Sequence, residues 1–224
     1  MISVFTTATF LPEKEYVLHV LLRVLLETDF RLRVAEKADA AAAVPPVMRF
    51  LLPNGACVEI EDHLFSRHTP ETYAHVDNIP PAAPSVAHPF HAESALTVIF
   101  GRPHYIFGEQ KAVCGIDVLA GSFFMLSRWE EYVHPARDAH GRFPAAASLA
   151  VRAGFLERPV VNEYAALMAD FFRHLGFEVP SPRRHFRMIY THDVDHPKLW
   201  YGTTDRLRTL AAAASAARRS ASRC

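Results

Sequence analysis

The alternation of apolar and polar residues along the first part of the chain predicts a mixture of strands and helices. Residues 2–6 are expected to form a strand, and a helix should begin at Pro12 and end near Thr28, because apolar residues recur there with helical spacing. The residues of this helix expected to face the core are Val17, Leu21, Val24 and Leu25. Residues 47–52 and 56–60 flank Asn54-Gly55, which is typical of a tight hairpin.

The following residues continue this alternation of element types. Strands are predicted at residues 96–100, 104–107 and 111–114, and a helix at residues 116–133. Pro159 begins a further helix, which Gly176 should end. The residues expected in the core occupy the apolar stripes of the helices: Val17, Leu21, Phe123, Leu126, Trp129, Tyr164, Met168 and Phe171. The pattern therefore indicates an α/β fold with a mixed sheet over residues 1–180, followed by a proline-containing linker at residues 178–184.

Residues 187–197, Arg-Met-Ile-Tyr-Thr-His-Asp-Val-Asp-His-Pro, hold the densest group of chemically active side chains. The apolar run predicts a strand at residues 186–191 that delivers Asp193, Asp195 and His196 to a sheet edge, where the sites of α/β proteins usually lie. Aspartate and histidine interleaved in this way suit a divalent cation such as Zn²⁺, Mn²⁺ or Mg²⁺. In the alternative interpretation, the aspartates cap the next helix and the histidines are solvated. A last helix should begin at Thr203 or Thr204.

A second group of histidines lies in residues 63–91, which contain many prolines and little periodicity. His88 and His91 form a His-x-x-His pair, but Pro89 disfavours the helix that would aim both rings at one metal ion. We therefore interpret this pair, like His63 and His68, as ordinary loop histidines.

Composition excludes several classes of protein. Half of the residues are hydrophobic, which indicates a globular chain, and 24 Lys+Arg balance 24 Asp+Glu, which gives no electrostatic basis for binding nucleic acid. The three cysteines form no C-x-x-C pair, so neither a disulfide framework nor a cysteine zinc site is indicated. The N-terminus lacks the basic start of a signal peptide, and no apolar stretch is long enough to span a membrane. A cytoplasmic protein without membrane association is expected.

Two parts of the chain carry a resemblance to one family. Thr191-His192-Asp193-Val194-Asp195-His196 resembles the first motif of the polysaccharide deacetylases, carbohydrate esterase family four, which lies at the end of the first strand of a distorted (β/α) barrel. The segments 115–118, 128–132, 141–144 and 158–164 resemble an uncharacterised domain that precedes a deacetylase-like barrel in some bacterial proteins. The resemblance implies an upstream domain at residues 1–180 and the first βα unit of a barrel at residues 185–224.

The resemblance also implies a chemistry, the metal-dependent hydrolysis of N-acetyl groups on carbohydrate. Asp193 would be the general base, Asp195 a ligand of the metal, and His196 a supplementary group at the metal. The cofactor would be a divalent cation, such as Zn²⁺, which polarises the acetamide carbonyl and lowers the pKa of its bound water.

Several departures from the family motif leave other functions open. Val194 stands where the motif has its second aspartate, and the His-Ser-x-x-His motif that completes the family's metal site is absent from this sequence. We therefore expect an incomplete, inactive relative of the deacetylases, or else a non-catalytic accessory or interaction domain. Asp-x-Asp after an apolar strand also resembles the haloacid-dehalogenase phosphatases, with Asp193 as nucleophile and Asp195 as acid/base. A glycosyltransferase Asp-x-Asp, which coordinates Mn²⁺ and a nucleotide sugar, ranks lower.

Overall fold

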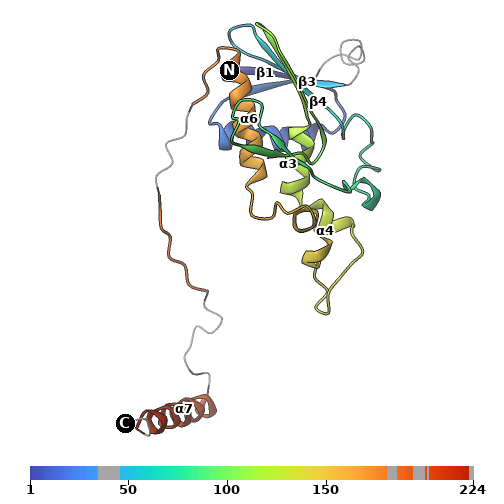
Figure 1. Ribbon diagram of the computed structural model, residues 1–224. Coiled ribbons are helices and arrows are strands. Elements are labelled where there is room, and N and C mark those ends of the chain that lie inside the picture. Colours follow the sequence, from blue (N-terminus) through green and yellow to red (C-terminus); the bar gives the residue numbers. More distant parts are fainter. Residues whose placement is uncertain (35–45, 181–185, 194–199, 201, 222–224) are drawn as a thin grey trace. The chain divides into compact units, whose positions relative to one another are not determined.

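The computed structural model describes residues 1–34, 46–180, 186–193, 200 and 202–221 (Figure 1). The chain divides into two compact units, residues 1–183 and residues 184–224. This division falls inside the linker that the sequence predicts at residues 178–184. The alanine-rich stretch at residues 38–43, which sequence reasoning interprets as an exposed connection, lies outside the described residues.

A six-stranded mixed sheet forms the centre of the first unit, in the order β2-β1-β3-β4-β8-β7. Its strands are β1 Ile2–Thr6, β2 Phe30–Val34, β3 Val47–Leu51, β4 Cys57–Glu61, β7 Gly101–Phe107 and β8 Lys111–Ile116. β1 is parallel to β2 and β4 is parallel to β8, whereas the other neighbours are antiparallel. A separate two-stranded sheet pairs β5 Ser85–Ala87 with β6 Ala95–Thr97. These findings confirm the predicted α/β fold.

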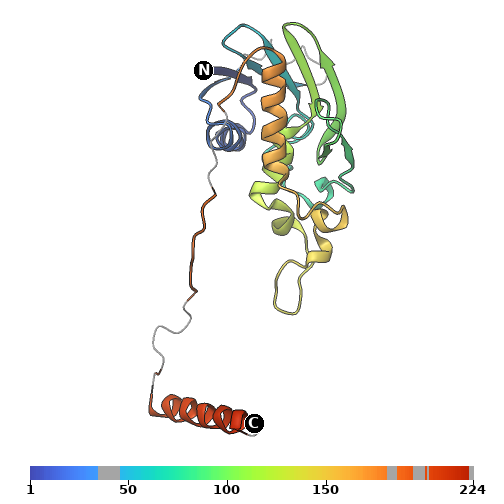
Figure 2. The ribbon, with the colours of Figure 1, turned by 60° about the vertical axis from the view of Figure 1, so that its left-hand side comes forward.

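The remaining elements of the first unit are helical. Their bounds are α1 Leu11–Leu18, η1 His19–Leu25, η2 Val76–Asn78, α3 Val118–Ser127, α4 Trp129–Val133, η3 Ala145–Ala147, α5 Leu149–Arg152 and α6 Val160–His174. The longest of them, α6, runs alongside the sheet (Figure 2) and contacts both α3 and η1. Of the eight core residues predicted on the apolar stripes of the helices, seven are buried and Leu126 is half-buried.

The two faces of the sheet differ in polarity. Val4 and Phe50 lie opposite each other in the β1–β3 register and are fully buried, and the Phe50 ring contacts Phe172 of α6. Successive residues of a strand point to opposite faces, so Arg49 lies on the other face. There its Nε donates to Glu59 Oε1 at 3.1 Å. Helices therefore cover one face of the sheet, and side chains on the other face form ion pairs.

The hairpin predicted at Asn54-Gly55 joins β3 to β4. Gly55 has a φ of 88°, a backbone conformation that glycine adopts more easily than other residues. The Leu52 amide donates to the Ala56 carbonyl at 2.8 Å. Asn54 Nδ2 donates to the Leu175 carbonyl at 2.7 Å. The hairpin tip therefore also satisfies a backbone acceptor just after the end of α6.

The helix predicted from Pro12 changes its pitch halfway. It begins as α1 and continues as the π-helix η1, whose wider turn shifts the buried stripe around the axis. As a result Leu21, Leu22 and Leu26 are buried, but Val24 is 57% exposed. The prediction that Val24 faces the core is wrong, because it assumes a constant α-helical spacing.

The single helix predicted at residues 116–133 is in fact two helices. Asp117 caps the first of them, α3, by accepting from the Ala120 amide at 2.9 Å. Arg128 then adopts a left-handed backbone with a φ of 53°, which ends α3 and begins α4. This change of direction lets Trp129 pack against Phe123 and Phe124.

The strands predicted at residues 96–100 and 104–107 also differ from those observed. β6 is short and pairs with β5 rather than with the central sheet, whereas β7 begins at Gly101. A register irregularity between Gly101 and Tyr105 lets the strand run through Pro103, whose ring nitrogen cannot donate to a ladder.

Among the described residues of the second unit, Thr203–Ala221 form the helix α7, which confirms the predicted last helix. The strand predicted at residues 186–191 is wrong, since residues 186–193 form no regular element. Phe186, Ile189 and Tyr190 are 88%, 79% and 81% exposed. An extended run needs neighbouring strands to satisfy its backbone, and no described strand pairs with this one.

None of the described helices is both long enough and apolar enough to cross a membrane.

Candidate functional site

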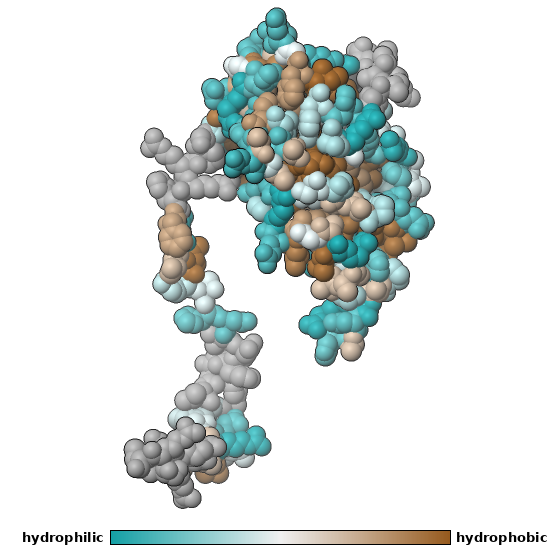
Figure 3. Space-filling view, in the orientation of Figure 1, coloured by the Kyte–Doolittle hydropathy of each residue, from teal (hydrophilic) through white to brown (hydrophobic). Residues whose placement is uncertain are grey.

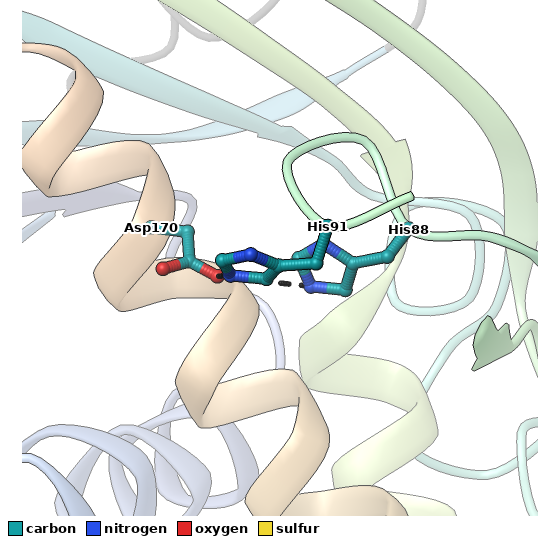
Figure 4. Close-up of side chains that lie close together, drawn as sticks. All are labelled: His88, His91 and Asp170. Atoms are coloured by element: carbon teal, nitrogen blue, oxygen red, sulfur yellow. Dashed lines mark hydrogen bonds and ion pairs between the residues drawn. The ribbon is translucent and has the colours of Figure 1, made fainter. Parts of the chain in front are cut away.

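The side chains of two histidines and one aspartate lie close together within the first unit (Figure 4). His88 and His91 come from the loop between β5 and β6, and Asp170 comes from α6. His91 Nε2 lies 2.9 Å from Asp170 Oδ2, and His88 Nε2 lies 3.7 Å from the same oxygen. The two imidazole rings are 4.7 Å apart between centroids.

The loop that carries the histidines is held by its own backbone. The amide of His88 donates to the Ser94 carbonyl at 2.9 Å, and the amide of Ser94 donates to the His91 carbonyl at 2.9 Å. The Phe90 amide donates to His88 Nδ1 at 3.2 Å. A turn, rather than a helix, therefore brings the two rings together.

His88 and His91 do lie in a loop, as predicted, but the expectation that Pro89 keeps their rings from one common target is wrong. Pro89 does prevent a helix, but a closed turn aims both rings at one carboxylate. The sequence pattern did not lead to a prediction of Asp170 as a site residue, although the sequence contains a signal for it. It is an acidic residue between Ala169 and Phe171 in the apolar stripe of α6, and it is buried.

The electrostatics of this group depend on burial. The side chains of His88 and Asp170 are 6% and 8% exposed, whereas that of His91 is 57% exposed. Burial lowers the pKa of His88, Asp170 opposes that shift, and His91 adds to it. Burial therefore favours the neutral form of His88. Arg173 Nη1 donates to Asp170 Oδ1, so the carboxylate is shared between a guanidinium and the imidazoles.

A cavity of about 530 Å³ opens beside the three residues. Its lining residues include Ser94, Leu96, Arg158, Glu163, Ala166 and Arg173. Arg158 binds Glu163 through two hydrogen bonds of 3.0 and 2.9 Å and also donates to the Ala95 carbonyl. The cavity wall thus carries two Arg–carboxylate pairs, whose charges balance.

Aromatic rings border the histidine loop. The Phe90 ring lies 5.2 Å from Phe107, 5.1 Å from Phe171 and 5.9 Å from His174 between centroids. Phe107 is 43% exposed, so this group reaches the surface. Figure 3 shows apolar and polar residues interspersed over one face of the unit.

Of the site residues predicted from the sequence, the structure describes Asp193 alone, and Asp193 is not part of this group. Asp193 is exposed in the segment 186–193, which has no regular structure. Asp195 and His196 lie outside the described residues. The divalent-cation site predicted at these three residues stays a prediction.

A second polar group lies at the carboxyl ends of the parallel strands β1, β4 and β8. Lys14 is 1% exposed, and its Nζ donates to Thr7 Oγ1 at 2.9 Å and lies 3.8 Å from Asp62 Oδ2. Asp117 Oδ2 accepts from the amides of His63 and Leu64 at 2.7 and 3.3 Å. This group is buried and hydrogen-bonded, so it fastens the strand ends together rather than presenting a surface to a ligand.

The first unit is therefore an α/β domain with a polar cavity against α6. The model of a family of unknown function, DUF7033, matches residues 2–176, and the chain belongs to that family. No curated protein and no solved structure matches the chain.

Proposed function

We propose that residues 2–176 form a carbohydrate-binding accessory domain of a polysaccharide deacetylase-related protein. The observation that carries this proposal is the cavity beside α6, whose charged groups are paired with each other. Because Arg158–Glu163 and Arg173–Asp170 cancel in charge, these pairs add hydrogen-bond donors and acceptors to the wall without adding net charge. Such a wall suits a neutral ligand with many hydroxyl groups.

The size and surroundings of the cavity support the same ligand class. About 530 Å³ falls within the usual range for small-molecule pockets, and it accommodates a short saccharide. Phe90 belongs to the histidine loop, and its ring contacts the exposed ring of Phe107 next to the residues that line the cavity. They give an apolar surface on which the carbon–hydrogen face of a sugar ring can pack.

For the chemistry of the whole protein we propose metal-dependent removal of N-acetyl groups from carbohydrate. Support comes from the resemblance of residues 191–196 to the deacetylase motif, with Asp193 as base and Asp195 and His196 at the metal. In the described structure Asp193 is exposed in an irregular segment, without the strand that would position a general base. We therefore expect this chain to bind carbohydrate but to release no acetate by itself.

Glu163→Gln is expected to weaken the binding of N-acetylglucosamine oligomers at least ~10-fold, the equivalent of losing about 1.4 kcal/mol. The substitution removes the charge that holds Arg158 in place and replaces one acceptor oxygen in the wall. Isothermal titration calorimetry of the oligomers into both proteins measures the change.

Arg142→Ala provides the matched control, because Arg142 pairs with Asp138 in an exposed turn that does not line the cavity. Unchanged affinity is expected for this control. Equal affinity of Glu163→Gln and the parent chain would contradict the cavity as the binding site. Acetate release by the parent chain that is lost in Asp193→Ala would contradict the expected lack of catalysis.

A further inference from the structure

We propose that His88, His91 and Asp170 bind a divalent transition-metal ion, with Zn²⁺ as the representative ion. Its ligands are different residues from Asp195 and His196, which the sequence predicts as metal ligands. The proposal concerns the metal alone and does not depend on the identity of the sugar. Among the residues that the structure describes, this group is the one in which three potential ligands meet.

The distances are suited to a metal with short bonds. One ligand atom from each residue can be chosen so that all three lie within 4.8 Å of one another. Ligand atoms of a tetrahedral zinc site with bonds of about 2.0–2.1 Å are roughly 3.3 Å apart. The observed separations of 2.9 Å for His91 to Asp170 and 3.7 Å for His88 to Asp170 lie on either side of that value. Two of the three separations are therefore already close to tetrahedral spacing.

The ligand types select among metals. Two imidazoles and one carboxylate suit zinc and its first-row neighbours, whereas Mg²⁺ and Ca²⁺ prefer oxygen ligands throughout. Three protein ligands also leave a coordination position free. Because His88, His91 and Asp170 all line the cavity, that position is available to water or to an oxygen atom of a bound molecule.

Arg173 is the positioning residue of the proposed site. It donates to Asp170 Oδ1, while both imidazoles approach Oδ2. The guanidinium thus fixes the plane of the carboxylate and leaves Oδ2 for the metal. Hydrogen bonds of this kind to a ligand commonly tune the affinity of metal sites.

Binding requires a defined change at His88. Its Nδ1 accepts from the Phe90 amide, so the neutral ring carries its hydrogen on Nε2, facing Asp170. To bind a metal through Nε2, the ring must move this hydrogen to Nδ1, and the Phe90 amide must then give up its acceptor.

The test is calorimetric titration of Zn²⁺ into the metal-free full chain carrying Asp195→Ala and His196→Ala, which silence the other predicted site. We expect about one equivalent to bind, and Mg²⁺ to produce no comparable signal. Adding His91→Ala should lower the affinity at least ~10-fold, as expected for the loss of a ligand. His91 is the most exposed of the three ligands, so this variant should still fold, which its thermal unfolding curve would check.

His63→Ala is the matched control, since His63 binds Glu61 and does not line the cavity. It should bind zinc like the background protein. Asp170→Asn supplies a second variant at the site and should lose binding as His91→Ala does. Zinc binding that is absent from the background protein, or retained in full by both site variants, would overturn the proposal. Zinc binding without binding of sugar would leave it intact and count only against the proposed carbohydrate function.

Discussion

Asp117→Ala is expected to destabilise the first unit by roughly 3 kcal/mol or more, because it leaves three backbone donors without an acceptor, at ~1–3 kcal/mol each. The carboxylate accepts from Ala120 at the start of α3 and from His63 and Leu64 after β4. Asp117 itself is 2% exposed, so water cannot readily replace it. Chemical denaturation at constant pH measures the loss of free energy of unfolding.

Asp117→Asn separates hydrogen bonding from charge. Asparagine keeps one oxygen acceptor and the approximate shape, so it should cost less than alanine. A loss below ~1 kcal/mol for the alanine variant would show that the three amides find other partners.

The same residue should make stability depend on pH. Burial, together with the nearby Asp62, raises the pKa of Asp117 from 3.8 to about 7, in spite of the amides that donate to it. Between these two values the folded chain holds a proton that the unfolded chain releases. The contribution of Asp117 is therefore complete below about pH 4 and is lost as the pH rises through about 7.

The measurement compares the parent chain with Asp117→Asn from pH 4 to pH 8. The stability advantage of the parent chain should shrink as the pH rises, while contributions from titratable groups that do not interact with Asp117 cancel in the difference. A constant difference over this range would contradict the raised pKa.

Gly121→Ala is expected to cost roughly 1–3 kcal/mol, the usual range for an overpacked core. A Cβ at Gly121 would lie 2.6 Å from Tyr164 Cε2. The Tyr164 ring cannot retreat easily, because its hydroxyl donates to the Thr97 carbonyl at 2.6 Å and accepts from the Ile99 amide at 3.3 Å. The helix-forming advantage of alanine over glycine, about 0.5–1 kcal/mol, is smaller than this clash.

A double-mutant cycle checks the cause. In a Tyr164→Leu background the ring is gone, so Gly121→Ala should become neutral or stabilising. An equal cost in both backgrounds would place the strain elsewhere. Thermal or denaturant unfolding of the four proteins gives all the free energies required.

The sequence alone predicts those elements whose signals lie within a few neighbouring residues. Asn54-Gly55 needs only its own backbone preference to specify the β3–β4 hairpin, and Pro159 and Gly176 bracket α6. The apolar stripe of α6 likewise follows from its spacing alone.

Other features depend on contacts that spacing cannot reveal. The π-helical pitch of η1 turns Val24 outward. Arg128 adopts a left-handed backbone conformation, although the sequence around it is typical of a continuous helix. Packing of Trp129 against Phe124 accompanies that break. These are tertiary effects that override local preference.

The candidate site was missed for the same reason. His91 and Asp170 are 79 residues apart in the sequence. Their approach depends on the short β5–β6 sheet and on the position of α6. Conversely, the apolar run at residues 186–191 has a strong preference for strand, but no described strand pairs with it. The local pattern alone therefore predicted a strand that the structure does not contain.

The order of strands in the sheet has a consequence for the rate of folding. Strands β1 to β4 all lie within the first 61 residues, whereas β8 must find β4 across a loop of about fifty residues. Closing that loop loses chain entropy before the parallel pairing contributes any energy. The first four strands can therefore assemble early, and docking of β8 beside β4 should limit the refolding rate. Substitutions between β4 and β8 should slow refolding. Substitutions in the β3–β4 turn should instead alter the assembly of the first four strands.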